Sequence, residues 1–128
     1  MPFADALETL ASAELGCGDE AAAETHFRPS ILMARQLFYG LAQISCLGGF
    51  ARLATARGDH VRALRLAAVV ERYSEEWEFR VEPFWTAWLR VAVEESRSKL
   101  GPAKANSAWR EGRAMELAKA VEYALEQH

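Results

Sequence analysis

Few side chains in this sequence have the type and spacing that catalysis requires. The three histidines, His26, His60 and His128, are scattered along the 128 residues, and no His-Glu-x-x-His pattern occurs. A histidine that acts as a base or a metal ligand needs a second group placed beside it. His60 directly follows the dipeptide Gly58-Asp59, which is typical of a turn that opens a helix. We therefore interpret the histidines as surface or capping residues.

The acidic residues offer a second possible chemistry, since paired carboxylates can act as acid and base. Glu75, Glu76, Glu78 and Glu82 follow one another closely, but a charge run beside a loop is usually a solvated face. The sequence also lacks the phosphate loop Gly-x-x-x-x-Gly-Lys, the Gly-x-Ser-x-Gly elbow and the Gly-x-Gly-x-x-Gly fingerprint. We expect no enzymatic activity, no cofactor and no bound metal.

Cysteine content and net charge narrow the possible partners. Cys17 and Cys46 do not form a Cys-x-x-Cys pair, so reduced thiols are favoured over a disulfide or metal site. The net charge of −3 gives no general attraction to phosphate backbones or anionic lipid, which argues against nucleic acid and membrane partners. The N-terminus lacks the basic and then apolar pattern of a signal peptide. These features predict a cytoplasmic protein.

The pattern of apolar residues predicts helices that must position any functional side chain. Leu47, Phe50 and Ala51 recur at helical spacing before Gly58-Asp59, and Ala63 and Ala67 do so after it. Glycine can end the first helix and aspartate can cap the second. The sequence therefore predicts a helical hairpin here, within an all-α fold of about six to seven helices in stacked antiparallel hairpins, forming a single domain over residues 1–128.

A second Gly-Asp pair, Gly18-Asp19, lies forty residues earlier and indicates an internal duplication. It predicts a first hairpin over about 3–36, before the second hairpin over about 37–77. Pro29 falls inside the helix that follows Asp19, where a proline costs about 3 kcal/mol in a straight helix. We expect a kink near Pro29, the alternative being a helix that stops at Arg28.

The C-terminal part predicts a degenerate third hairpin and a capping helix over about 83–127. Pro83 and Pro102 each suit the first position of a helix, and Gly101 separates them. We expect helices over Pro83–Leu100, Pro102–Arg113 and Ala114–Gln127. The last of these is amphipathic, and we expect it to cap the open end of the stack.

The small residues Ala51 and Ala63 flanking Gly-Asp resemble the pattern of a tetratricopeptide repeat. More specifically, the segment Ala-Trp-x-Glu-Gly-Arg-Ala-Met at Ala108 to Met115 resembles the C-terminal region of large ATP-binding bacterial transcriptional regulators of the LuxR and maltose-regulator type. The similarity covers most of the chain. It implies a non-catalytic interaction or sensor module that contacts protein partners, including neighbouring parts of a larger regulator.

The repeat resemblance also implies a binding surface, because the first helix of each hairpin lines the groove of such arrays. Carried over one by one, the groove positions are Asp5, Glu8, Ser12, Ser45, Arg52, Thr55, Trp88 and Glu95. This mixture of charges with one aromatic residue suits a peptide or partner helix.

Two alternatives stay open at this stage. A small-molecule pocket or a minor enzymatic site between hairpins would draw on Arg113 and on the aromatic cluster Trp77 to Trp88, which is either core or contact surface. A homodimer would cover the apolar residues of the first helix, Phe3, Leu7 and Leu10, at the N-terminal end.

Overall fold

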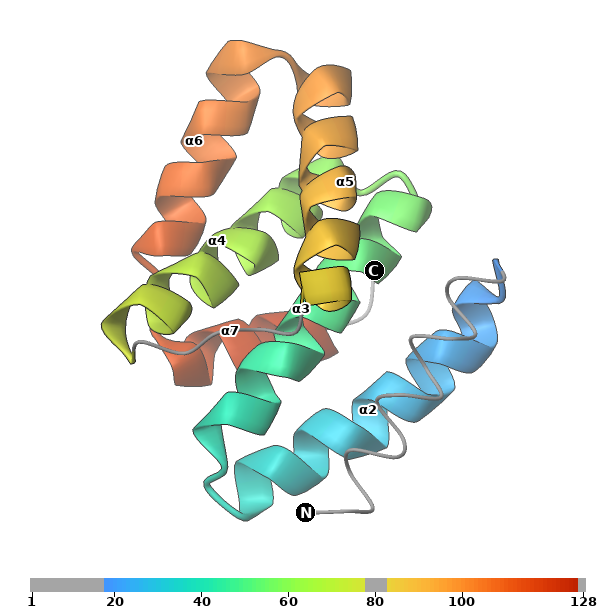
Figure 1. Cartoon of the computed structure of the whole chain (residues 1–128), viewed down its shortest axis with the longest axis vertical. Coiled ribbons are helices and arrows are strands. Elements are labelled where there is room, and N and C mark those ends of the chain that lie inside the picture. The colour runs from blue at the N-terminus through green and yellow to red at the C-terminus, as the bar shows by residue number, and fades with distance from the viewer. Residues whose placement is uncertain (1–17, 78–82, 127–128) are drawn as a thin grey trace.

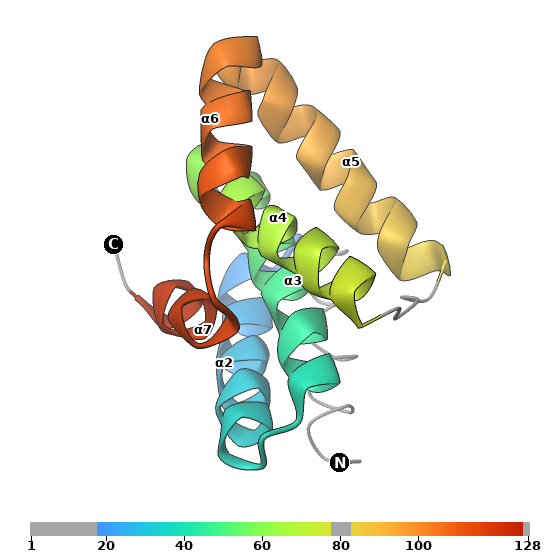
Figure 2. The same ribbon diagram turned by 90° about the vertical axis from the view of Figure 1, so that its left-hand side faces the viewer.

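The computed structural model describes residues 18–77 and 83–126, except for the side chains of 83–86 and 88. Within these residues every regular element is an α-helix, as the sequence predicts. The helices are α2 (Glu20–Gln36), α3 (Gly40–Ala56), α4 (His60–Glu76), α5 (Pro83–Leu100), α6 (Pro102–Arg113) and α7 (Leu117–Leu125). Figures 1 and 2 show α2, α3 and α4 running back and forth, with α5 and α6 on one side and α7 on another. The predicted first helix and the segment 78–82 lie outside the described residues.

The forty-residue duplication is visible in α2 and α4, which begin forty residues apart and both contain 17 residues. The Asp19 carboxylate accepts a hydrogen bond from the Ala22 amide at 3.1 Å, and Asp59 does the same for Arg62 at 3.3 Å. Each aspartate thereby satisfies an amide that the first helical turn leaves without a partner. The predicted turn at Gly58-Asp59 joins α3 to α4, and this pair makes the most extensive helix contact.

Helix α2 passes through Pro29 without ending, so the alternative in which it stops at Arg28 is wrong. Phe27, Ile31 and Ala34 stay on one buried face across the proline and lie in contact with the core. The burial of such side chains, about 1.5–3 kcal/mol each for the large ones, offsets the hydrogen bond that Pro29 cannot donate. The ring of Phe27 packs so closely on Gly49 of α3 that a β-carbon there would collide with it.

Helices α5 and α6 form the third hairpin, and their predicted bounds are confirmed. α6 approaches α4 through a stripe of small buried residues, Ala105, Ala108 and Gly112. A β-carbon at Gly112 would collide with the carbonyl oxygen of Arg65 and lie 2.7 Å from the β-carbon of Ala68. The most specific part of the sequence resemblance, Ala108 to Met115, is therefore a helix-packing segment in this fold.

The last helix does not cap the outer end of the stack, which corrects that prediction. α7 turns back and packs against α3 and α4, where Ala120, Val121 and Ala124 join the main core. It is also shorter than predicted, because the chain crosses from α6 to Leu117 before the helix starts. Figure 2 shows α7 below the C-terminal end of α6 and not over its outer face.

Arginines hold α7 at its C-terminal end. Arg28 of α2 donates to the carbonyl of Leu125 at 2.6 Å. Arg62 of α4 donates to the carbonyls of Tyr123, Ala124 and Glu126, the last two at 3.2 and 3.0 Å. These carbonyls lie in the last turn of α7 or directly after it, and positive charge at a helix C-terminus is favourable.

Tyr73 of α4 fixes the other end of α7. Its hydroxyl accepts a hydrogen bond from the Leu117 amide at 2.9 Å and donates to the Glu116 carboxylate at 3.1 Å. Burial is the main cause that raises the pKa of the Tyr73 phenol.

Candidate interaction site

The structure does not assemble the predicted groove residues into one open surface. Asp5, Glu8 and Ser12 lie outside the described residues, as does the side chain of Trp88. Ser45 is half-buried in α3, and Glu95 is exposed on α5. The N-terminal residues Phe3, Leu7 and Leu10, for which a homodimer contact was predicted, are likewise outside the described residues.

Thr55 does not face an open groove, so this prediction is wrong. Its hydroxyl lies 2.9 Å from the hydroxyl of Ser96 and 3.4 Å from the carbonyl of Ala92, both on α5. Thr55 is 6% exposed and Ser96 is fully buried. Since α5 packs directly on this part of α3, the position serves the contact between hairpins.

Arg52, another of the predicted groove residues, is also buried, with 8% of its surface exposed. Desolvation lowers the pKa of its guanidinium to about 10. The side chain is therefore part of the interior of the fold, and the prediction that it offers a guanidinium in an open groove is wrong.

A serine and a histidine do meet in the structure, but not as a catalytic pair. Nδ1 of His60 lies 2.9 Å from the Ser96 hydroxyl, which continues the chain of polar contacts to Thr55. Because Ser96 is fully buried, no substrate can reach its oxygen. The arrangement links α3, α4 and α5.

The most unusual backbone conformation among the described residues is at Phe38, between α2 and α3. Phe38 has φ of 54°, whereas the other positive φ values belong to Gly18, Gly58 and Gly101. A bulky residue in this region costs roughly 1–2 kcal/mol relative to glycine.

The turns before α3 and before α4 have the same hydrogen-bond pattern. The Tyr39 amide donates to the Ala34 carbonyl at 2.9 Å, and the Phe38 amide donates to Arg35 at 3.2 Å. Twenty residues later, Asp59 donates to Ala54 at 2.8 Å and Gly58 to Thr55 at 3.1 Å. Phe38 therefore occupies the position that Gly58 occupies in the sister turn, where glycine is the usual helix-ending residue.

The Phe38 side chain contributes almost nothing to the core, because it is 90% exposed. Leu37 and Tyr39 beside it are 57% and 41% exposed, and Trp77 is 42% exposed. The Trp77 ring lies over Gly40, the residue after Tyr39, where a β-carbon would be 2.7 Å from it. We call Leu37, Phe38, Tyr39 and Trp77 the turn surface.

Trp77 is thus the member of the predicted aromatic cluster that the structure places at the surface. Its ring centre lies 5.1 Å from that of Tyr73, in a tilted contact. The side chains of Phe84, Trp85 and Trp88 are outside the described residues. Arg113, the other residue expected of a small-molecule pocket, instead pairs with Glu71 at 3.2 Å and Glu75 at 3.0 Å across α6 and α4.

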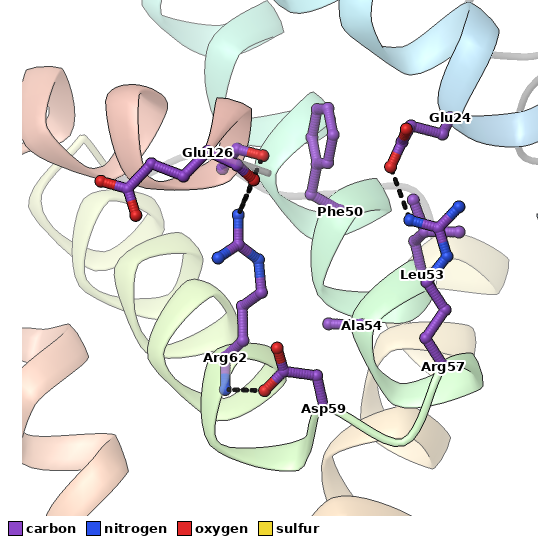
Figure 3. A pocket seen from close by; sticks show the side chains of 9 residues that line it. Glu24, Phe50, Leu53, Ala54, Arg57, Asp59, Arg62 and Glu126 are labelled. Atoms are coloured by element: carbon purple, nitrogen blue, oxygen red, sulfur yellow. Dashed lines mark hydrogen bonds and ion pairs between the residues drawn. The ribbon is translucent and has the colours of Figure 1, made fainter. Parts of the chain in front are cut away.

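A hollow of about 390 Å³ opens between α2, α3, α4 and the end of α7 (Figure 3). Its apolar lining comes from Phe50, Leu53, Ala54 and Ala124, and its polar lining from Glu24, Arg57, Asp59, Arg62 and Glu126. The polar groups largely satisfy one another: Arg57 pairs with Glu24 at 2.5 Å, and Arg62 binds the carbonyls of α7. Its volume is within the range of sites that hold a small group.

The usual turn residues do not mark Phe38, since this turn lacks the glycine and aspartate of its sister. The available signal was the run Leu-Phe-Tyr at 37–39 between two helical patterns, where polar residues are usual. The hollow was equally hidden, because its lining comes from four helices.

No protein-family model, curated protein or solved structure matches this chain. In the part of the chain that the structure describes, no helix combines the length and apolar character that a membrane crossing requires. The same residues contain no group of three or more histidine, cysteine, aspartate or glutamate side chains suited to a metal ion.

Proposed function

We propose that this chain is a non-catalytic helical-repeat module of the LuxR regulator type, whose role is to bind protein partners, including neighbouring parts of a larger cytoplasmic regulator. The observation that carries the proposal is the turn surface around Phe38. A large aromatic side chain is held in a conformation that favours glycine, yet it buries almost nothing within the chain. Backbone strain at an exposed residue is a mark of functional positions.

The composition of the turn surface supports a protein partner. Three of its four members are aromatic, and exposed tyrosine, tryptophan and phenylalanine are enriched at protein interfaces. Arg35 lies three residues before Phe38, is exposed, and makes no ion pair with any residue that the structure describes. A partner that offers an apolar hollow with a carboxylate at its rim would complement both features.

The hollow in Figure 3 supports a second candidate, a small effector molecule. This candidate is weaker, because an effector would have to displace the Arg57–Glu24 pair or compete with the carbonyls of α7 for Arg62. The turn surface requires no such exchange.

Photo-crosslinking tests the proposal directly. A photoreactive amino acid at position 38, in the protein as its full reading frame encodes it, should form one or a few defined crosslinks to polypeptide. The same group at Val91, which is 65% exposed on α5, is the matched control and should give no defined product. Diffuse labelling from position 38, equal to that from position 91, would contradict the proposal.

A further inference from the structure

The exposed ring of Phe38 and the hollow are compatible in size and in apolar character. Phe38 projects from the turn with 90% of its surface exposed, so a partner must enclose it rather than lie flat on it. The hollow has an apolar lining of Phe50, Leu53, Ala54 and Ala124, and a volume of about 390 Å³. A phenyl ring belongs to the size class that such a cavity accommodates.

The charges around the two features are complementary as well. The hollow is lined by the carboxylates of Glu24 and Asp59 and by two guanidinium groups, while Figure 3 shows the Glu126 carboxylate turned away from it. Glu24 and Glu20 already pair with Arg57, and Glu24 also lies 3.7 Å from Arg28, so these charges balance, whereas Asp59 makes no ion pair with any residue that the structure describes. Arg35 brings a positive charge beside Phe38.

Asp59 is the carboxylate best placed to receive that charge. One of its oxygens accepts the Arg62 amide, and Figure 3 shows the other turned toward the space between Ala54 and Arg62. Arg57 and Arg62 do not oppose an incoming arginine strongly, because each already contacts carboxylate or carbonyl oxygens.

We propose that the chain associates with a second copy of itself, with Phe38 of one copy seated in the hollow of the other and Arg35 beside the Asp59 carboxylate. This inference rests on the proposed function, since it identifies the partner of the turn surface. It also accounts for the strain at Phe38: in the free chain the residue has only a cost, and in the assembly it supplies the buried aromatic anchor on which such interfaces depend.

The first test is sedimentation of the full chain over a range of concentrations. The protein should associate reversibly, and Phe38→Gly should weaken association about tenfold or more, as loss of an aromatic anchor does. Glycine suits the positive φ at this position, so Phe38→Gly does not weaken the fold. A loss of association in this variant therefore reports on the contact itself. Val91→Ala removes another exposed apolar side chain and should leave association unchanged.

The second test separates this arrangement from a contact between two turn surfaces. Ala54→Leu adds side-chain volume inside the hollow and should block it while leaving Phe38 in place. Neither Phe38→Gly nor Ala54→Leu should associate alone. A mixture of the two variants should associate, because the hollow of the Phe38→Gly protein can receive Phe38 of the Ala54→Leu protein.

The outcomes distinguish this inference from the proposed function. A mixture of the two variants that stays monomeric, or a Phe38→Gly protein that associates like the original, overturns self-association through this contact. If position 38 then crosslinks to a different polypeptide, the proposed function stands without the self-association. If position 38 crosslinks neither to a second copy nor to another polypeptide, both this inference and the proposed function fail.

Discussion

Phe38 is the residue at which local backbone preference and the observed conformation disagree most. Phe38→Gly should raise the free energy of unfolding by about 1 kcal/mol, because glycine tolerates a φ of 54° and the exposed phenyl ring is lost without leaving a cavity. Urea denaturation measures the change. The sister position provides the control: Gly58→Ala, at φ of 81°, should lower stability by about the same amount. A destabilised Phe38→Gly protein would mean that the ring makes a stabilising contact within the chain.

Tyr73 links stability to alkaline pH, because burial raises its pKa in the folded protein above the ordinary phenol value of about 10. Above pH 10 the unfolded chain loses the phenolic proton before the folded chain does, so stability falls as the pH rises toward the folded pKa. Below pH 10, Tyr73→Phe should cost about 1–2 kcal/mol for the lost hydrogen bonds to Glu116 and Leu117. This difference should shrink as the pH rises above 10.

The measurement is the difference in unfolding free energy between the original chain and Tyr73→Phe at several pH values. Arg52, whose pKa burial lowers to about 10, contributes equally to both proteins and cancels. Val121→Ala, a variant of a fully buried residue without a titrating group, should show a difference that does not change with pH. A constant difference for Tyr73→Phe would contradict the raised pKa.

At the scale of elements, Gly112 sets how closely α6 approaches α4. In an exposed helix, alanine in place of glycine is favourable by up to about 1 kcal/mol. Here the added β-carbon collides with the Arg65 carbonyl, so Gly112→Ala should instead cost about 1–3 kcal/mol. Thermal unfolding shows whether Gly112→Ala raises or lowers the stability of the protein. Ser107→Ala, at an exposed position of the same helix, should change stability by less than about 0.5 kcal/mol.

Arg62 anchors α7 through charge-assisted hydrogen bonds to its last carbonyls. Arg62→Met keeps most of the aliphatic length but loses these bonds, and we expect a cost of about 1.5–3 kcal/mol in the free energy of unfolding. Arg57→Met is the matched control, because Arg57 makes exposed ion pairs with Glu24 and Glu20 that are worth at most about 1 kcal/mol. If both variants lose the same unfolding free energy in denaturant titrations, the hydrogen bonds of Arg62 contribute no more than an exposed ion pair does.

Helix bounds could be predicted from the sequence where a proline, a glycine or a capping aspartate determines them. Pro83, Gly101 and Pro102 mark the bounds of α5 and α6, and Asp59 marks the start of α4, because a missing amide or a capping carboxylate acts within one turn. The C-terminal end of α4 has no comparable local signal, and the helix continues through Glu75 and Glu76, which we expected beside a loop.

The site was less predictable, because it depends on contacts between distant parts of the chain. Thr55 is buried because Ser96 and Ala92 lie 37 to 41 residues further along, a proximity that helical periodicity does not encode. Phe38 was missed for the opposite reason, since its local sequence argues against the conformation that it adopts.

At the scale of the whole molecule, the core consists of two clusters of unequal size. The larger joins α2, α3, α4 and α7 through Phe27, Leu47 and Val121 among others. The smaller joins α4 to the α5–α6 hairpin through the buried residues Leu64, Ala105 and Ala108. Proteins built of stacked hairpins open in such units, and the unit with fewer buried apolar side chains opens at the lower free energy.

We therefore expect amides in α6 and in the second half of α5 to exchange with solvent through a partial opening that costs less free energy than global unfolding. Those in α3 and α4 should exchange only through global unfolding, because both helices contribute to the larger cluster. Hydrogen exchange followed by mass spectrometry as denaturant is added separates the two classes. Gly112→Ala should ease the opening of α6 while leaving the protection of α2 unchanged, since α2 takes no part in the smaller cluster. A single exchange free energy shared by α3 and α6 would mean that the two clusters unfold as one unit, coupled through Val93 and Trp109, which pack against both.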